Sequence, residues 1–288
     1  MKTEEEMKEK ALGLLKCFIK EKLEDDIDNL KKYSFWGILE DKGYNRCFNG
    51  VSSNEKDFDG DRTKIVYAID YLLYDNLPEF KISDTLEAEN YTGETINTFN
   101  TLFSRLPEQR EKIKALFGED WKKIQDEDKD TDFFADDFYH VYQRLGNFML
   151  LPHRKDSGKP NINTYKGSCK KDYFDLFFQE LKELLPLNDE KNNSSTLLRL
   201  LEKNNFYFKD KTAEVFLEDF YLKGYDDFNL GNEVHYYHRY KNLFSDDSLK
   251  EQYKKFALDY VEKATALINA RSEELVKVLK EKYPELKK

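Results

Sequence analysis

The chain has 288 residues, and its 57 acidic side chains outnumber 47 lysines and arginines, which gives a net charge of −10. Glycine (12) and proline (6) are scarce, whereas aromatic residues make up 15% of the chain. This composition argues against collagen-like, linker-like and disordered chains, because the aromatic side chains provide ample surface to bury. The acidic balance also argues against a broad surface for nucleic acid or anionic membranes.

The sequence predicts a cytoplasmic protein. Residues Met1 to Glu6 are not followed by an apolar stretch of the secretory type, and no run of about 18 apolar residues predicts a membrane span. The three cysteines, Cys17, Cys47 and Cys169, are far apart and form no Cys-x-x-Cys pair. Neither a disulfide framework nor a zinc knuckle is therefore expected.

Apolar residues spaced three and four positions apart predict helices in the N-terminal half. The predicted helices cover 3–32, a stretch from about Asp61 to before Pro78, a stretch from Ile96 to Leu106 introduced by Thr92-Gly93-Glu94, and a stretch from Pro107 to Gly118. The acidic residues Asp126 to Asp132 predict an exposed connection. A further helical stripe runs from Phe133 to Tyr142 and is expected to end at Gly146.

In the middle of the chain the helical spacing of apolar residues is interrupted. Phe148 to Leu151 form a continuous apolar run that is too short for a helix, which predicts a buried extended segment near 147–152. A loop over 153–167 follows, containing glycine, proline and asparagine. Loops of this length inside a compact chain are usually functional or disordered.

Helical spacing returns in the C-terminal half, over 171–185, 195–203 and 211–222. The last predicted helix covers 248–283: Ser248 and Glu251 suggest a capping box, an apolar stripe runs from Leu249 to Leu279, and Pro284 ends it. About 35 residues give roughly 50 Å of helix. A helix of that length must pack along a whole domain edge or against a partner chain.

These patterns predict a mostly α fold, an irregular multi-helix bundle with a short extended segment near 147–152 and a long C-terminal helix. Residues 1–288 are expected to form a single helical domain. A subdivision into an N-terminal helical part, 1–125, and a C-terminal helical part, 126–288, stays open.

The segment from Arg144 to Pro152 reads Arg-Leu-Gly-Asn-Phe-Met-Leu-Leu-Pro, and asparagines follow about ten residues later. It resembles the C-terminal part of HNH-type nuclease domains associated with modification-dependent restriction. There a Gly-Asn step leads into a strand and a later asparagine orients the catalytic histidine, so the resemblance implies His153 and Asn163 as catalytic candidates. No Asp-His-x-x-Pro precedes Gly146, however, and metal-assisted hydrolysis needs that base and ligand.

A longer resemblance covers about 144–228. Gly-Asn-Phe-x-x-x-Pro, then Ile-Asn-Thr-Tyr-Lys-Gly, then Lys-Lys-Asp-Tyr-Phe-Asp-Leu, and further on Phe-Tyr-Leu, follow in the order of an uncharacterised bacterial family of unknown function. Lys166 and Tyr173 stand where that family has arginines. No activity is implied by this resemblance.

The loop over 153–167 is locally basic within an acidic protein. Converging Arg, Lys and Asn donors suit a phosphate or a carboxylate, so the ligand-binding candidates are Arg154, Lys159, Asn161, Asn163 and Lys166. The alternative is an exposed loop that is basic by chance.

His235 and His238 are three residues apart and would share one face of a helix, with Glu233 nearby. A transition-metal site needs three or four ligands, and this group supplies two or three. Surface histidines among aromatic residues are the favoured interpretation, and the sequence predicts no cofactor.

The leading functional hypothesis is a bacterial cytosolic interaction protein, in phage defence or mobile-element biology, as the family resemblance implies. Its partner would be another protein, or a second copy bound through the helix over 248–283. The alternative is a nucleic-acid-acting or phosphate-binding enzyme, a relative of HNH nucleases, that uses the loop over 153–167.

Overall fold

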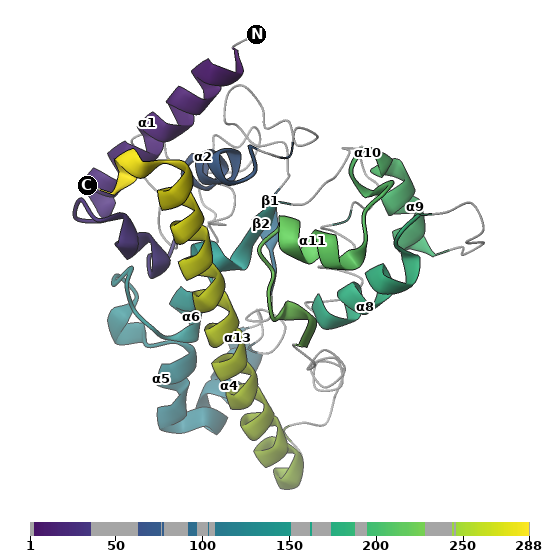
Figure 1. The fold of residues 1–288 in the computed structure, drawn as a ribbon. Helices are drawn as coiled ribbons and strands as arrows, with labels where there is room; N and C mark the ends of the chain where they lie inside the picture. Colours follow the sequence, from purple (N-terminus) through teal and green to yellow (C-terminus); the bar gives the residue numbers. More distant parts are fainter. Residues whose placement is uncertain are drawn as a thin grey trace.

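The computed structural model describes residues 3–35, 63–75, 77, 92–96, 103, 107–150, 162, 174–187, 195–227, 244 and 246–287. Within these ranges the chain is mostly helical, with a two-stranded antiparallel sheet and a long C-terminal helix (Figure 1). The predicted fold class is therefore confirmed. Buried apolar side chains from every part of the described chain form one core cluster.

Helix α1 (Glu4–Lys22) begins at Thr3, whose side chain and backbone form a capping box with Glu6. The prediction of one helix over 3–32 is wrong beyond residue 22. Glu24 and Asp25 have φ angles of 54° and 63°, in the left-handed region, which a right-handed helix cannot continue. The chain then forms a short 3-10 turn, η1 (Ile27–Lys31), in which Ile27 and Leu30 are buried.

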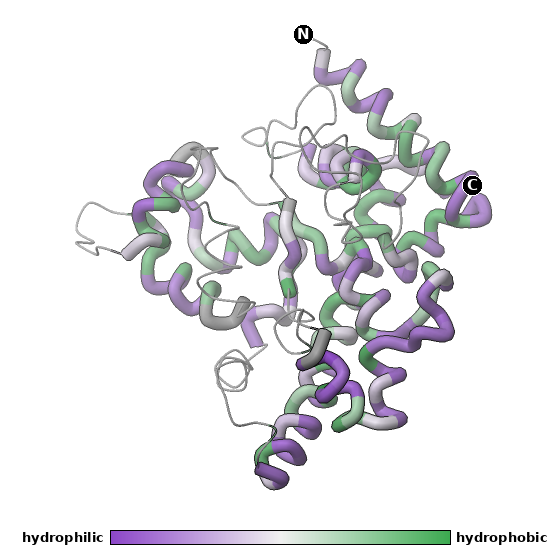
Figure 2. The backbone as a smooth tube through the Cα atoms, turned by 180° about the vertical axis from the view of Figure 1, so that it is seen from behind, coloured by the Kyte–Doolittle hydropathy of each residue, from purple (hydrophilic) through white to green (hydrophobic). Residues whose placement is uncertain are grey.

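Helix α2 (Lys64–Leu73) packs against α1. Its N-cap is Thr63, whose hydroxyl accepts the Val66 N–H at 3.3 Å, so the helix begins slightly later than predicted. It ends before Pro78, as expected. Figure 2 shows green and purple alternating along the longer helices, the pattern of amphipathic elements.

The sheet consists of β1 (Thr92–Glu94) and β2 (Phe148–Leu150), with Gly93 opposite Met149. All three side chains of β2 are buried, which confirms the extended segment near 147–152. The sequence predicted that Thr92-Gly93-Glu94 introduces a helix. In the structure these residues form strand β1, because β2 provides their hydrogen-bonding partner. Most of the helix predicted over Ile96 to Leu106 lies outside the described residues.

Helix α4 (Pro107–Phe117) has the predicted bounds, and Gly118 follows it with a φ of +56°. The chain continues through η3 (Gly118–Asp120), α5 (Trp121–Ile124) and η4 (Glu127–Lys129). Residues 127–132 are exposed, which confirms the predicted connection, with Asp126 half-buried. The helix predicted from Phe133 is reduced to α6 (Phe138–Val141), which Asp137 caps, followed by η5 (Leu145–Asn147).

The third quarter of the chain forms a cluster of short helices on the right of Figure 1. It contains α8 (Phe174–Leu184), α9 (Thr196–Lys203), α10 (Asn205–Phe208), α11 (Ala213–Asp219) and η7 (Tyr225–Asp227). The helices predicted over 171–185, 195–203 and 211–222 are thus confirmed in type, with ends shifted by a few residues.

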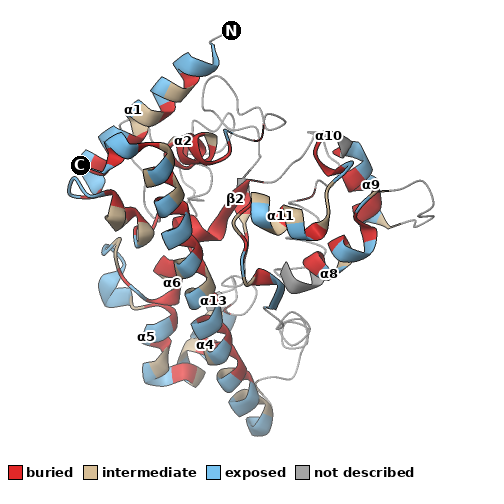
Figure 3. Cartoon of the chain, in the orientation of Figure 1, coloured by how far each residue is buried: buried red, intermediate tan, exposed pale blue. Residues whose placement is uncertain are grey.

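Helix α13 (Asp247–Lys282) runs along the molecule and contacts η1, α2, α4, α6 and η5. Figure 3 shows its buried residues on the side that faces these elements and its exposed residues on the outer side. Its cap is Asp246, whose carboxylate accepts the N–H groups of Ser248 and Leu249 at 3.0 and 3.2 Å, so the predicted Ser248 cap is wrong. The helix ends as predicted, before the short turn η9 (Pro284–Leu286). No helix in the described ranges is both long and apolar enough to cross a bilayer.

Candidate functional site

The site residues predicted from the sequence cannot be placed. His153, Arg154, Lys159, Asn161, Asn163 and Lys166, together with His235 and His238, all lie outside the described residues. Ile162 is the described residue of the loop, and it is fully buried. The roles proposed for this loop and for the histidine pair stay predictions.

The Gly-Asn step that precedes this loop is described, and its asparagine is a structural residue. Asn147 Oδ1 accepts hydrogen bonds from Thr95 Oγ1 at 2.7 Å and from the Ile96 N–H at 2.8 Å. Its Nδ2 donates to the carbonyls of Ile96 and Tyr142, both at 2.8 Å. Every hydrogen-bonding position of this buried amide is therefore used. Three of the four bonds join η5 to the residues after β1, and the fourth joins it to the Tyr142 carbonyl after α6.

Gly146 lies in direct contact with the middle of α13. Its N–H donates to Ser272 Oγ at 2.9 Å, and a Cβ at this position would lie 1.9 Å from the Ile268 carbonyl oxygen. Arg271 donates to the carbonyls of Gly146 and Phe148 at 2.8 and 2.6 Å. The backbone of η5 and β2 is thus held against α13 by the side chains of Ser272 and Arg271, at a separation that only glycine permits at position 146.

Two further buried ionisable groups, Asp70 and Tyr74, lie beside Arg271. Asp70 on α2 lies near Arg271, and its Oδ2 has no hydrogen-bond partner among the described residues. Burial raises the pKa of Asp70 to about 8, although the Arg271 charge acts in the opposite direction. Burial also raises the pKa of Tyr74, whose hydroxyl lies 3.2 Å from an Arg271 nitrogen.

His140 and Asp137 form a buried pair on α6. Asp137 Oδ2 lies 2.7 Å from His140 Nδ1, and Asp137 Oδ1 accepts the backbone N–H of His140 at 3.3 Å. An aspartate in this position can orient a histidine as a general base. The His140 side chain is fully buried, however, and lines neither of the surface hollows described below. We therefore assign this pair to the capping of α6.

Two hollows open on the surface beside α5. The smaller, of about 170 Å³, lies between the end of α4, α5 and η4. The larger, of about 490 Å³, lies between α5, the Asp136-Asp137 pair and α13. Lys122 and Asp126 line both hollows, so the two adjoin each other.

We call the surface formed by the charged residues of both hollows the acidic face. Six carboxylates with exposed or half-buried side chains contribute to it, together with four lysines, whereas the seventh carboxylate, Asp137, is buried and paired with His140. These residues are Lys114, Glu119, Lys122, Lys123, Asp126, Glu127, Asp128, Lys129, Asp136, Asp137 and Glu262. A ligand that complements this surface should carry positive charge.

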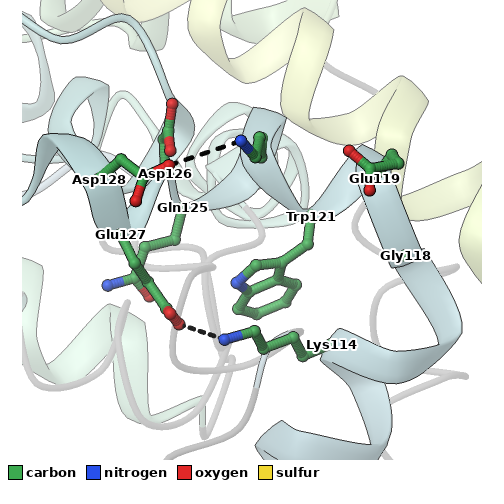
Figure 4. A pocket seen from close by; sticks show the side chains of 9 residues that line it. Lys114, Gly118, Glu119, Trp121, Gln125, Asp126, Glu127 and Asp128 are labelled. Atoms are coloured by element: carbon green, nitrogen blue, oxygen red, sulfur yellow. Dashed lines mark hydrogen bonds and ion pairs between the residues drawn. The ribbon is translucent and has the colours of Figure 1, made fainter.

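Trp121 forms the floor of the smaller hollow, which we call the Trp121 hollow. Its side chain packs edge-on against Phe103 and Phe117, and the residue is only 3% exposed. Its Nε1 has no hydrogen-bond partner among the described residues. Figure 4 shows the indole nitrogen turned toward Gln125 and toward the ion pair of Lys114 with Glu127.

The ion pair of Lys114 with Glu127 closes the hollow near the Trp121 indole only weakly. Lys114 Nζ donates to Glu127 Oε1 at 2.6 Å, but the two side chains are 36% and 51% exposed. An exposed pair of this kind contributes between about 0 and 1 kcal/mol, whereas an unpaired buried donor costs about 1–3 kcal/mol. A ligand oxygen that satisfied the indole N–H could therefore displace the ion pair at little cost.

Comparison of the chain with protein-family models, with curated proteins and with solved structures finds no match. Among the described residues, no group of three or more His, Cys, Asp or Glu side chains is arranged to hold a metal ion. The fold and the acidic face therefore carry the functional argument.

Sequence analysis missed the residues that matter most in this geometry. Arg271 stands among the apolar positions of α13, four residues before Leu275 and three after Ile268, and that position indicated a buried arginine. No comparable signal marks Trp121. Its hollow forms only where α4, α5 and η4 meet.

Proposed function

We propose that this chain is an interaction protein that binds a partner protein on the acidic face. The observation that carries the proposal is the pair of adjoining hollows beside α5, lined by seven carboxylates and four lysines. Such a surface favours a basic partner segment, and it disfavours nucleic acid because phosphates would meet an excess of carboxylates. The resemblance over 144–228 would place this partnership in the bacterial cytoplasm, in phage defence or mobile-element biology.

The acidic face suits this role better than the apolar side of α13. Apart from the exposed Ala266 and Ala270, the apolar residues of that helix are already buried or half-buried against the chain's own core. Self-association through 248–283 stays a prediction, and a second copy would meet the polar outer side of the helix.

The test uses a photo-crosslinking amino acid at Lys129 or Glu262 on the acidic face, with Glu5 at the exposed start of α1 as the control position. In cells of the source bacterium, we expect a single protein to be captured from the first two positions and not from Glu5. Purified, that protein should bind the wild-type chain and bind the Glu262→Lys variant more weakly.

Two results would contradict the proposal. One is the absence of a specific adduct from both positions on the acidic face. The other is a captured protein whose affinity is unchanged by Glu262→Lys and by Asp128→Lys.

A second candidate function rests on the anchoring of the basic loop. Leu150 at the end of β2 and Ile162 within the predicted loop are both fully buried. We propose, as the alternative, that this loop binds phosphate or nucleic acid, with His153 and Asn163 in the catalytic roles implied by the HNH resemblance.

This alternative predicts divalent-metal-dependent cleavage of DNA or RNA by the purified chain. The activity should be lost in a His153→Ala, Asn163→Ala double variant and reduced in Lys159→Ala, whereas Lys20→Ala on α1 should leave it unchanged. Equal activity in all variants would show that a contaminant is responsible, and the alternative would then be dropped.

A further inference from the structure

We infer that the Trp121 hollow receives a lysine or arginine side chain of the partner, and that a main-chain carbonyl beside that side chain accepts a hydrogen bond from Trp121 Nε1. The inference rests on the proposed function and names the chemistry of its partner. It also assigns a role to an indole N–H that has no acceptor within the described part of the chain.

The buried indole N–H of Trp121 is a hydrogen-bond donor that needs an acceptor. Trp121 is 97% buried and its Nε1 has no acceptor among the described residues. Figure 4 shows the nitrogen directed into the hollow between Gln125, Glu127 and Lys114. Nearly all buried N–H groups in proteins have a partner, so this donor calls for one from outside the described chain.

Charge decides which kind of acceptor fits. Four carboxylates line the hollow, Glu119, Asp126, Glu127 and Asp128, against the two lysines Lys114 and Lys122. Both lysines already face carboxylates, at 2.6 Å for Lys114 with Glu127 and 3.6 Å for Lys122 with Asp128. An anionic acceptor would be repelled, whereas a neutral carbonyl accompanied by a cation would be attracted.

The size of the hollow agrees with this occupant. Its volume of about 170 Å³ equals roughly six water molecules at about 30 Å³ each, which is enough for one side chain but not for a folded element. The larger hollow adjoins it, because Lys122 and Asp126 line both. An extended segment could therefore place one residue in the Trp121 hollow and continue into the larger one.

Separation of the ion pair between Lys114 and Glu127 would open the hollow. Both ends of the pair are partly exposed, so they can separate without disturbing the core. An arriving cation would pair with Glu127 in place of Lys114. The freed Lys114 would turn to solvent, and the indole N–H would become accessible to the carbonyl.

The experiment follows the indole N–H signals of the uniformly ¹⁵N-labelled full chain. The sequence has two tryptophans, so two such signals are expected, and the Trp121→Phe variant assigns one of them by its loss. The probes are two synthetic peptides, acetyl-(Gly-Lys)₄-amide and acetyl-(Gly-Glu)₄-amide. We expect the lysine peptide to shift the Trp121 signal in a saturable way, and the glutamate peptide to leave it unchanged.

The variants separate the hydrogen bond from the charge. Trp121→Phe should weaken binding of the lysine peptide about tenfold, which is the loss of one buried hydrogen bond. Glu119→Gln should weaken it severalfold, whereas Glu5→Gln, a matched change on α1, should leave it unchanged. If Trp121→Phe fails to fold, the Glu119→Gln variant and the indole signal still decide the matter.

Saturable binding of the lysine peptide without a change in the Trp121 signal would overturn the inference and leave the proposed function standing. Failure of the lysine peptide to bind would also overturn it. The crosslinking result at Lys129 and Glu262 tests the proposed function separately, so the two failures are distinguishable.

Discussion

At the scale of single residues, Gly146 leaves less room for a side chain than Gly13, Gly118 or Gly224. A Cβ there would lie 1.9 Å from the Ile268 carbonyl oxygen, and a backbone atom cannot rotate out of the way. We expect Gly146→Ala to separate η5 from α13 and to cost about 1–3 kcal/mol or more, by analogy with overpacked cores. The measurement is the Tm, which falls about 2–4 °C per kcal/mol in a chain of this size.

Gly13 provides the matched control. It lies within α1, and a Cβ there would meet no atom within 4 Å. Gly13→Ala should raise stability by about 0.5–1 kcal/mol, because alanine is the better helix former. Equal Tm changes in the two variants would contradict the packing described for Gly146.

Asp70 makes the stability of the fold depend on pH. Burial raises its pKa from 3.8 to about 8 in the folded chain, so between those values the folded state holds a proton that the unfolded state has lost. The contribution of Asp70 to stability is therefore fully present below about pH 4 and is lost as the pH rises through about 8, with a slope of at most about 1.4 kcal/mol per pH unit.

Asp70→Asn should remove this dependence, because the amide does not titrate. We expect the variant to be more stable than the wild type at pH 8, and the difference to shrink as the pH falls toward 4. Urea unfolding at a series of pH values measures it. Parallel stability curves for the two proteins would show that Asp70 is ionised in both states.

At the scale of elements, α13 begins at a capping residue that can be tested directly. Asp246 accepts two backbone N–H groups of the first turn, and its negative charge lies at the positive end of the helix. Asp246→Ala should cost about 1 kcal/mol. Ser248→Ala should cost less, since Ser248 is not the cap. A larger fall in Tm for Ser248→Ala than for Asp246→Ala would instead support Ser248 as the cap, as the sequence predicted.

At the scale of the whole molecule, α13 joins regions that are far apart in the sequence. It contacts η1 and α2 from the first 75 residues, and α6 and η5 from the middle of the chain. The sheet also pairs β1 with β2 across residue 125. The contacts of α13 with η1 and α2 and the pairing of β1 with β2 all cross residue 125, so neither 1–125 nor 126–288 contains both sides of them.

We therefore expect fragments 1–125 and 126–288 to be largely unfolded when expressed separately, and to recover helical circular dichroism when they are co-expressed. A cooperative thermal transition in either isolated fragment would instead support two domains that fold independently.

Much of the fold followed from local chemistry that the sequence displays. The repeated apolar spacing of α13, the start of α4 at Pro107 and its end at Gly118 depend on neighbouring residues alone, and they were predicted correctly. The buried extended segment at β2 was predicted for the same reason, since a short apolar run is visible without knowing what covers it.

The candidate site was not predictable in this way. The break at Glu24 and Asp25 was not visible in the apolar spacing. The pairing of β1 with β2 and the hydrogen bond from Arg271 to the Gly146 carbonyl each join segments that are distant in the sequence. The Trp121 hollow likewise forms only where α4, α5 and η4 converge. Periodicity determined which residues face inward, but tertiary packing decided which polar groups found partners, because a hydrogen bond depends on the position of both atoms and the sequence specifies only their identities.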